Sequence, residues 1–600
     1  MDYTQAQIEA IFHGRGPALI LAVPGAGKTT VLLARLAQLI ENGEDPKRML
    51  TITFSKAASL DMKERFQKLF PKLPPPFFLT IHALCFQIIR KFDPQASSYQ
   101  VLSGPLYSLA NDIFRKAYQK NFHRLPNDDQ KEAFFQDLGR AKNLQISFEA
   151  YRQDDHCQSP NFPSLARDYE REKARHKVID FDDMMVLALN LLEKERVRKR
   201  VQGAFDWIQV DEGQDTSKLQ MSVIYKLLKE KNLLIVADDD QSIYAFRGAR
   251  PQELKDYDRD YQPKKYYLED NFRSTDHIIS LSKDFIAQNK DRFPKSMEGQ
   301  GDLGLPVQVI QTRRAKDQYA FIKDQISPGK KAAILYRNTV SSMGLVNAFA
   351  EEDFAIRSRE VKFFHHPIIL DLLHFMALAE NPKDAQAMGS IYYKMKGYLS
   401  KKMLAHLGQE GGNVFRAMAS TPGLKDFQRQ QVYDLQKDFT HLASLEVPEK
   451  LYFILEDLDY KAYLDYFHKK WSTSLDQLYL IYDQVIALSK DCRDLAAFQG
   501  KVSYLKRKIL DAPSKADLTF STIHGVKGLE FDQVFVLDLV EGSFPSLQSM
   551  DQPSLYEEER RLFYVAMTRA KEELYLLSPR QAYSMPTRKS PFLRELEDLI

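Results

Sequence analysis

Residues 18–40 read ALILAVPGAGKTTVLLARLAQLI, and this stretch decides the fold. Residues 18–23 form an apolar run with the length of a buried parallel strand. The glycines of residues 24–27 (PGAG) interrupt that run and let the backbone approach a ligand closely. From Lys28 onward the apolar positions recur at helical spacing, and Asn42-Gly43 ends the pattern. The stretch therefore predicts a strand, a loop and a helix.

A loop of backbone amides ahead of a helix N-terminus is an anion site. Lys28 adds a point charge for the β- and γ-phosphates of a nucleoside triphosphate, and the Thr29 hydroxyl is placed for Mg²⁺. The strict motif begins with glycine, whereas this chain has Ala22 and reads AxxxxGKT. The alternative is a chance turn before a helix, which the flanking strand and helix make less favourable. The predicted nucleotide-binding residues are Ala22, Val23, Pro24, Gly25, Ala26, Gly27, Lys28, Thr29 and Thr30.

The composition is that of an ordinary water-soluble protein. The chain has 600 residues, 44% apolar and 28% charged, and this length predicts three or four domains. A net charge of +3 excludes a polycationic surface, so any nucleic-acid binding must come from local patches and stacking. Cys85, Cys157 and Cys492 lie far apart, which fits a reducing cytosol and indicates no zinc or iron–sulfur site. We expect a cytoplasmic protein with no signal peptide and no membrane span.

The rest of the chain alternates strands and helices in the manner of two parallel sheets. Strands of the first sheet are expected at 18–23, 49–54, 78–81, 205–210 and 233–237. Strands of the second sheet are expected at 307–311, 332–336, 518–523, 534–537 and 574–577. Two long polar, helical stretches interrupt this pattern. The sequence thus predicts an α/β fold with a first sheet domain at 1–88 and 180–268, its helical insertion at 89–179, a second sheet domain at 269–355 and 514–600, and its helical insertion at 356–513.

Several polar residues follow the predicted strands. Asp211 and Glu212 end a strand, where an aspartate holds Mg²⁺ through water and a glutamate polarises the attacking water; an acidic turn is the alternative. Gln241, after the next strand, is a candidate sensor of the γ-phosphate. The rings of Tyr244 and Phe246 alternate with the cation of Arg247 as in a base-stacking platform. For Tyr244, a core aromatic is an equally good interpretation.

A second group of signals lies near the C-terminus. Residues 557–571 (EEERRLFYVAMTRAK) predict a strongly periodic helix with Arg569 near its end. An arginine in a last helical turn is usually a partner of the helix dipole or a surface charge. Only the resemblance of the whole chain favours a functional role for it.

The ordered motifs resemble superfamily 1 DNA helicases of the UvrD/Rep/PcrA kind over nearly the whole chain. The matching segments are TQAQIEAI (4–11), the phosphate loop, TFSKAASLDM (53–62), TIHAL (80–84), VDEGQDTSKLQ (210–220), DDDQSIYAFRGA (238–249), NFRST (271–275), STIHGVKGLEFDQVFVLDLVEGSFP (521–545) and YVAMTRAKEEL (564–574). The resemblance implies two RecA-like domains that use ATP and Mg²⁺.

It also implies roles for individual residues. The catalytic set would be Lys28, Glu212, Gln241, Arg273 and Arg569, with both arginines arriving from the second core domain. Thr29 and Asp211 would hold the metal. Gln7 would read adenine, Phe272 would stack on it, and Glu530 would touch the ribose. The single-strand track would be lined by Phe54, His82, Tyr244, Phe246, Arg247, Thr522, His524 and Lys527.

The activity implied is an ATP-dependent translocase on single-stranded DNA and a 3′–5′ DNA helicase in DNA repair, replication or recombination. Its substrates would be single strands and single/double-strand junctions. Two alternatives stay open: a translocase that clears proteins from DNA, and a motor subunit of a separate nuclease in repair or phage defence. The chain stops soon after SPFLREL (590–596), so a nuclease or repair partner is a further candidate. A non-motor P-loop switch is a more distant alternative.

The chain departs from the family pattern in five places. Phe272 stands where tyrosine is common, Phe246 where tryptophan is common, and Gly213 where phenylalanine or alanine is frequent. A ring face survives at the first two positions, so stacking should persist. YRNT (336–339) shifts an expected asparagine. YYKMKGYLSKKML (392–404) replaces an arginine-glycine helix-hairpin-helix segment, which leaves duplex contact there open.

Overall fold

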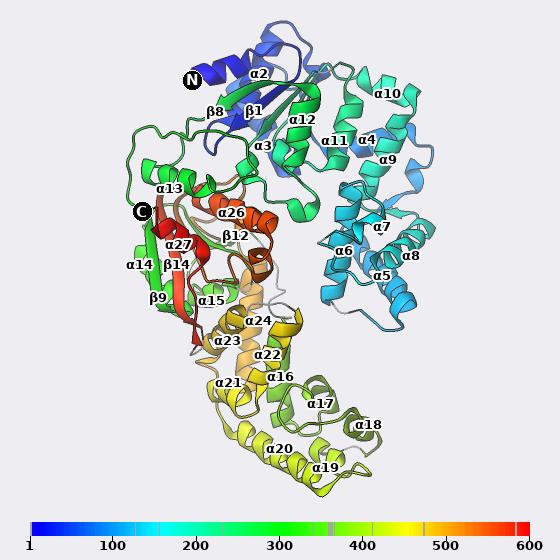
Figure 1. The fold of residues 1–600 in the computed structure, drawn as a ribbon, viewed down its shortest axis with the longest axis vertical. Helices are drawn as coiled ribbons and strands as arrows, with labels where there is room; N and C mark the ends of the chain where they lie inside the picture. Colours follow the sequence, from blue (N-terminus) through cyan, green and yellow to red (C-terminus); the bar gives the residue numbers. More distant parts are fainter. Residues whose placement is uncertain are drawn as a thin grey trace. The chain divides into compact units, whose positions relative to one another are not determined.

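A computed structural model describes residues 3–599 apart from 127, 155, 231, 340, 358–363, 365, 411, 472–474, 583 and 584. The chain divides into two compact units (Figure 1). The first comprises Met1–Arg273 and Asn289–Gln300, and the second comprises Ser274–Gln288 and Gly301–Ile600. Among the described residues, no helix is both long and apolar enough to cross a membrane.

The first unit is built on a six-stranded parallel sheet of order β3-β2-β6-β7-β1-β8. Its strands are β1 (Ala18–Ala22), β2 (Met49–Thr53), β3 (Phe77–Thr80), β6 (Trp207–Val210), β7 (Leu233–Ala237) and β8 (Lys264–Leu268). Every residue of β1 is buried, because β1 lies between β7 and β8 with Ala18 opposite Leu234 and Ala22 opposite Leu268. A parallel sheet covered on both faces needs such continuous apolar strands.

Helices cover this sheet and form the first insertion. They are α1 (Gln5–Ile11), α2 (Lys28–Glu41), α3 (Lys56–Leu69), α4 (Ile81–Phe92), α5 (Tyr107–Phe122), α6 (Asp128–Asn143), α7 (Phe148–Tyr151), α8 (Phe162–Arg175), α9 (Phe181–Glu193), α10 (Glu195–Gln202), α11 (Lys218–Leu227) and α12 (Gln252–Tyr261). The helices α5–α8 have an apolar core of their own, which includes Phe114, Phe134 and Tyr151. A small parallel pair, β4 (Gln100–Val101) with β5 (Val178–Ile179), joins the start of this insertion to its end.

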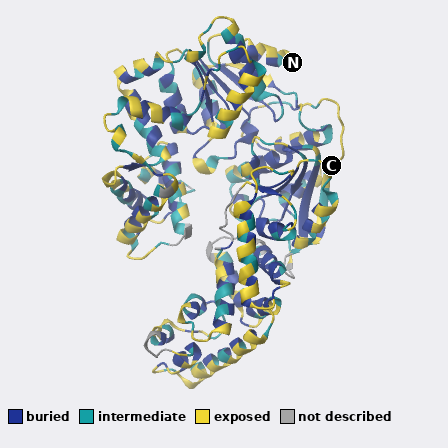
Figure 2. Cartoon of the chain, turned by 180° about the vertical axis from the view of Figure 1, so that it is seen from behind, coloured by how far each residue is buried: buried dark blue, intermediate teal, exposed yellow. Residues whose placement is uncertain are grey.

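The second unit contains the other sheet, of order β11-β12-β10-β13-β14-β15, with β9 also pairing with β14. Its strands are β9 (Gln308–Arg314), β10 (Ala332–Tyr336), β11 (Ala355–Ile356), β12 (Leu518–Thr522), β13 (Phe531–Val536), β14 (Ala570–Ala582) and β15 (Met585–Pro586). All the pairs are parallel except β14 with β15. In Figure 2 the strands of both sheets are mainly buried.

The helices of the second unit include its long insertion. They are α13 (Asp276–Ile286), α14 (Ala315–Gln325), α15 (Ser341–Ala348), α16 (Pro367–Glu380), α17 (Ala385–Ile391), α18 (Lys401–Glu410), α19 (Val414–Ala419), α20 (Asp426–Ser444), α21 (Val447–Glu456), α22 (Tyr460–Trp471), α23 (Leu475–Ser489), α24 (Leu495–Asp511), α25 (Leu547–Met550), α26 (Pro553–Met567) and α27 (Pro591–Glu597). One continuous apolar core joins insertion residues such as Phe375 and Leu478 to sheet residues such as Phe520. The second insertion therefore packs as an extension of its sheet domain.

The predicted α/β class with two parallel sheets is confirmed, and the expected strands lie within a few residues of the observed ones. The short strands β4, β5, β11 and β15 were not expected, and two longer elements also differ. The sequence analysis did not identify β8, an edge strand whose residues 264–268 are only partly buried. The helix expected at 557–571 ends at Met567, because Ala570 already pairs with Phe531 as the start of β14.

Residues 269–273, which the sequence analysis placed at the start of the second sheet domain, group with the first unit in the structure, as do residues 289–300. The backbone N–H of Phe272 donates to the carbonyl of Gly25 at 3.2 Å, and that of Asn271 donates to Glu298 at 2.8 Å. These bonds hold residues 271–273 against the phosphate loop.

Candidate functional site

The loop between β1 and α2 has the geometry of an anion-binding loop. Gly25 and Gly27 adopt φ angles of 73° and 75°, a left-handed conformation that glycine tolerates without strain. Gly27 is the N-cap of α2 and offers no side chain to the first helical turn, so the N–H groups of that turn have no side-chain cap. Ala22 is the last residue of β1 and keeps strand pairing with Leu268, so the strand accommodates alanine at that position.

Lys28 extends from the first turn of α2 toward the end of β7. Its Nζ donates to the carbonyl of Val23 at 3.3 Å and lies 3.7 Å from Asp238 Oδ2. Burial lowers the pKa of the Lys28 ammonium, and the nearby carboxylates of Asp238 and Glu212 offset part of this effect. A phosphate group bound in the loop would supply a closer counter-charge.

Asp211 and Glu212 follow β6 at the same edge of the sheet. Among the described residues, Asp211 Oδ1 is buried and has no hydrogen-bond partner. Burial and the adjacent Glu212 carboxylate raise the pKa of Asp211 to about 7. A buried carboxylate oxygen without a partner suits a cation, so the residues present fit Mg²⁺, with the Thr29 hydroxyl at the start of α2 as the second expected ligand.

Glu212 has a left-handed backbone, with φ 52° and ψ 45°. Such a conformation costs a non-glycine residue about 1–3 kcal/mol and is common at functional sites. The side-chain amide of Gln214 donates to Glu212 Oε2, and its oxygen accepts from the backbone N–H of Asp238 at 2.9 Å. Gln214 thus connects the ends of β6 and β7. The sequence analysis did not single it out, although it lies two positions after Glu212 in an otherwise acidic motif.

Gly213 explains one departure from the family pattern. A Cβ atom at this position would lie 2.3 Å from Ile235 Cγ2 and 3.4 Å from Leu254 Cδ2, so no side chain fits without movement. We expect Gly213→Ala to destabilise the protein by about 1–3 kcal/mol through overpacking. Urea unfolding measures this change. In the Ile235→Ala background, Gly213→Ala should cost less stability than it does in the wild type. Equal costs in the two backgrounds would contradict the argument.

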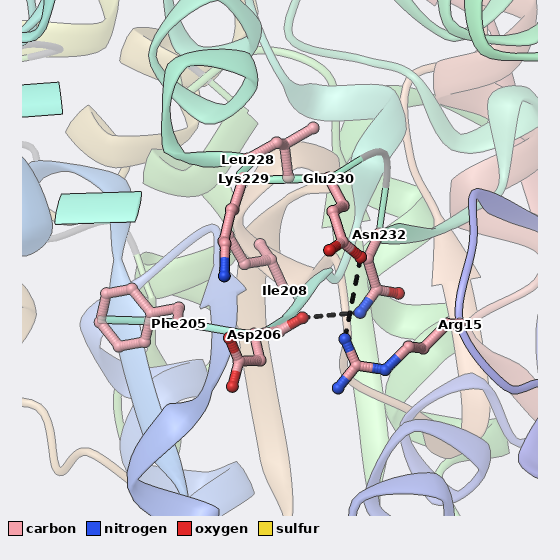
Figure 3. A pocket seen from close by; sticks show the side chains of 8 residues that line it. All are labelled: Arg15, Phe205, Asp206, Ile208, Leu228, Lys229, Glu230 and Asn232. Atoms are coloured by element: carbon pink, nitrogen blue, oxygen red, sulfur yellow. Dashed lines mark hydrogen bonds and ion pairs between the residues drawn. The ribbon is translucent and has the colours of Figure 1, made fainter. Parts of the chain in front are cut away.

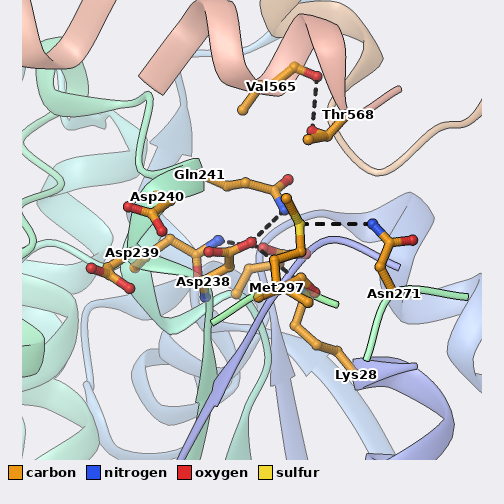
Figure 4. A network of polar contacts seen from close by, with 12 residues as sticks. Lys28, Asp238, Asp239, Asp240, Gln241, Asn271, Met297, Val565 and Thr568 are labelled. Carbon is orange, nitrogen blue, oxygen red and sulfur yellow. Dashed lines mark hydrogen bonds and ion pairs between the residues drawn. The ribbon is translucent and has the colours of Figure 1, made fainter. Parts of the chain in front are cut away.

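Gln241 and Asp238 form the centre of a network drawn in Figure 4. Gln241 Nε2 donates to Asp238 Oδ2 at 2.6 Å. Burial raises the pKa of Asp238, but the ammonium groups of Lys295 and Lys28 outweigh it and lower that pKa overall. The Lys295 ammonium contacts the carboxylates of Asp238, Asp239 and Asp240. The sequence analysis missed Lys295, because its polar surroundings in NKDRFPKS (289–296) carry no local signal of burial.

The four further nucleotide residues are distributed over both units. In the first, Gln7 Nε2 donates to the carbonyl of Ala26 at 3.2 Å, and Phe272 has 51% of its surface exposed. Arg273 is the last residue of the first segment of the first unit, and its backbone N–H donates to Asn271 Oδ1 at 2.7 Å. In the second unit, Glu530 pairs with Lys571 at 3.0 Å.

Arg569 lies in the second unit between α26 and β14 and is buried. Its guanidinium donates to the carbonyls of Val565 and Leu529 at 3.0 and 3.2 Å, and to the hydroxyl of Thr568 at 3.2 Å. Its burial excludes the surface charge considered as one alternative, whereas its bond to the carbonyl of Val565 in the last turn of α26 agrees with the other, a partner of the helix dipole.

The aromatic residues of the expected single-strand track gather in the first unit. Phe54 and Tyr244 are stacked with ring centroids 4.8 Å apart, and Phe246 lies 5.9 Å from Tyr244. The Arg247 guanidinium lies over both Tyr244 and Phe246, at 5.3 and 5.5 Å. Phe54 and Phe246 remain 37% and 42% exposed, so their faces are available to a ligand. Burial raises the pKa of Tyr244 to about 12, so this ring stays neutral.

The other members of the expected track belong to other elements. His82 packs edge-on against Phe181 with centroids 5.6 Å apart, and burial lowers its pKa. Thr522 ends β12 in the second unit, and His524 and Lys527 follow it in and after a short 3₁₀ turn. The sequence analysis did not consider Arg140 of α6, whose guanidinium donates to the carbonyl of Ala245 and so holds the aromatic segment.

A separate small pocket of about 30 Å³ lies at the opposite edge of the first sheet, where β6 and β7 begin (Figure 3). Asn232 donates to the carbonyl of Asp206 at 2.6 Å, and Arg15 lies 3.8 Å from Glu230. These groups are partnered within the protein, and we assign no ligand to them.

Comparisons with known proteins agree with this geometry. The sequence profile of the UvrD/REP helicase N-terminal domain matches residues 3–262, and that of the UvrD-like helicase C-terminal domain matches residues 266–581. A Bacillus subtilis chain, YjcD, assigned by name to the ATP-dependent DNA helicases, is 30% identical over 98% of this chain and 80% of its own length. The ATP-dependent DNA helicases PcrA of Staphylococcus epidermidis and Staphylococcus aureus are each 29% identical over 99% of this chain and 86% of their own lengths. The chain belongs to the UvrD/Rep helicase family.

Proposed function

We propose that the chain is a DNA-stimulated ATPase that moves 3′ to 5′ along single-stranded DNA and unwinds duplex DNA in repair, replication or recombination. As a member of its family it is an ATP-dependent DNA helicase that acts on DNA. The direction, the pathway, the preference for single-strand/duplex junctions and the roles of individual residues are parts of the proposal.

One observation carries the coupling between ATP and DNA. The segment from Asp238 to Arg247 begins at a carboxylate that contacts Lys28 and Gln241, and its other end carries Tyr244, which stacks on Phe54. A shift of Gln241 on loss of the γ-phosphate would be passed along this short segment to the exposed rings. Base–aromatic stacking tolerates any sequence, as a translocating motor requires.

In the proposed reaction, the loop residues 22–30, which include Lys28, hold the triphosphate of ATP. Glu212 orients and polarises the attacking water. Gln241, Arg273 and Arg569 would contact the γ-phosphate. Thr29 and Asp211 would hold Mg²⁺, which neutralises phosphate charge when bound. Gln7, Phe272 and Glu530 would contact the nucleoside.

The first test is ATP hydrolysis with and without single-stranded DNA, for the wild type and Lys28→Ala. We expect strong stimulation by DNA in the wild type and loss of hydrolysis in Lys28→Ala, because the variant lacks the charge that neutralises the β- and γ-phosphates. Lys229→Ala, at the far edge of the sheet, is the matched control and should behave like wild type. Hydrolysis indifferent to DNA would contradict the proposal, as would an active Lys28→Ala. Duplexes with only a 3′ or only a 5′ single-stranded tail test the direction.

The aromatic cluster gives a second prediction. We expect Phe246→Ala to weaken the binding of an oligo-dT strand by about 1–3 kcal/mol, because one base loses its stacking partner. Fluorescence anisotropy of a labelled strand measures the change. Tyr267→Ala removes a similarly exposed ring from β8 and should leave the affinity unchanged. Unchanged binding by Phe246→Ala would assign that ring to packing alone.

A further inference from the structure

The second unit contains a pocket of about 70 Å³ that the proposed helicase mechanism does not use. It lies where α23 of the long insertion packs against α14 and α15 of the sheet domain. All its lining residues belong to the second unit, so its shape does not depend on the first.

The inner wall of this pocket carries polar groups without protein partners. Gln484 of α23 is only 3% exposed, and among the described residues neither its amide nitrogen nor its amide oxygen has a hydrogen-bond partner. The same holds for the hydroxyl of Tyr319 on α14, which is also buried. A Cβ atom at Gly344 would lie 2.3 Å from that hydroxyl, so a glycine of α15 leaves room for it. Burying these groups unsatisfied costs free energy, so a bound water or ligand must satisfy them.

The rest of the wall is rich in positive charge. Arg314, Lys316 and Lys490 line the pocket, and Asp483 is the one carboxylate among its lining residues. The Lys490 ammonium lowers the pKa of Lys316, which places the two like charges close together. Arg314 is the N-cap of α14, so the pocket also faces the positive end of this helix dipole. Asp317 in the first turn of α14 adds a second carboxylate beside Lys316 and caps the helix through the backbone N–H of Arg314. Three cations against these two carboxylates still leave the wall net positive, which favours an anion.

We propose that this pocket binds a small phosphate-type oxyanion, as free phosphate or as the phosphate of a mononucleotide. The amide nitrogen of Gln484 and the hydroxyl of Tyr319 would donate to its oxygens, and Arg314, Lys316 and Lys490 would balance its charge. Water alone explains the pocket less well. A single water needs about 10–15 Å³, which is less than the volume of the pocket, and neutral waters give no reason for the cations to gather. The ligand would join the insertion to the sheet domain, because its partners come from both.

The test is isothermal titration of inorganic phosphate, and separately of deoxyadenosine monophosphate, into the full chain at constant ionic strength. We expect Lys490→Glu to weaken phosphate binding by about tenfold or more. Lys437→Glu, an exposed lysine of α20 outside the pocket, is the matched control and should bind like wild type. Lys28→Ala shows how much of the measured phosphate binding comes from the ATP loop. It should keep the part of the binding that Lys490→Glu loses. Binding of inorganic phosphate alone would indicate a free-phosphate site, and tighter binding of the mononucleotide would indicate a nucleotide phosphate.

Gln484→Leu separates this proposal from a water-filled pocket. In phosphate-free buffer, Gln484→Leu should have a higher unfolding temperature than the wild type, because it lacks the unsatisfied amide. Phosphate should raise the unfolding temperature of the wild type but not that of Gln484→Leu. Three outcomes would overturn the proposal: no phosphate binding by the wild type, equal phosphate binding by Lys490→Glu and Lys437→Glu, or equal stabilisation of Gln484→Leu and wild type by phosphate. Loss of oligonucleotide affinity in Lys490→Glu without loss of phosphate binding would assign the cations to DNA instead.

Discussion

Replacing Glu212 with glutamine is expected to lower DNA-stimulated turnover by about 10²–10⁴-fold, the usual worth of a positioned general base. The variant keeps the size of the side chain and an oxygen that can accept the hydrogen bond from Gln214. It loses the negative charge that polarises the attacking water. Binding of ATP should survive, because the loop amides and Lys28 are untouched.

The measurement is a single-turnover hydrolysis assay beside an ATP-binding titration. Glu230→Gln makes the same chemical change at the opposite edge of the sheet, where Glu230 lines the small pocket near Arg15, and should leave both quantities unchanged. If Glu212→Gln hydrolyses ATP at close to the wild-type rate, another group activates the water. If it fails to bind ATP, its role lies in holding the loop network instead.

The sequence was sufficient for the parts of the site whose geometry is local. The strand, glycine loop and helix at 18–40 are contiguous, so the pattern itself determines how they fold. The same applies to Asp211 and Glu212, which follow a buried strand and must lie at the same sheet edge as Lys28. The parallel order of the strands places these segments together without further information.

Contacts between distant segments could not be derived in this way. Phe54 and Tyr244 are far apart in the chain, and only the resemblance to a family suggested that they act together. Phe272 lies against the phosphate loop because its backbone N–H donates to the carbonyl of Gly25, a contact that no residue pattern reveals. The burial of Lys295 makes sense only where three carboxylates converge on it.

Arg569 poses a harder question, because the structure gives it a packing role that accounts for its burial without any ligand. Three of its hydrogen bonds stay within the second unit and join the end of α26 to the loop before β13. The guanidinium has five N–H donors, so a contact with the γ-phosphate would use a donor beside these bonds or replace one of them during the ATP cycle. Such an arginine stabilises charge in the transition state and can be worth about 10³–10⁵ in rate.

We therefore expect Arg569→Ala to lose about 10³-fold or more in turnover while its affinity for ATP changes far less, because the interaction forms mainly in the transition state. Truncation also leaves the carbonyls of Val565 and Leu529 without this donor, so the unfolding temperature should fall as well. Arg561→Ala is the matched control, since Arg561 is an equally buried arginine of α26. Equal losses of turnover in the two variants, each tracking its loss of stability, would make Arg569 a structural residue. A loss of turnover in Arg569→Ala far beyond that of Arg561→Ala, at similar stability, is the result that the phosphate-contact role requires.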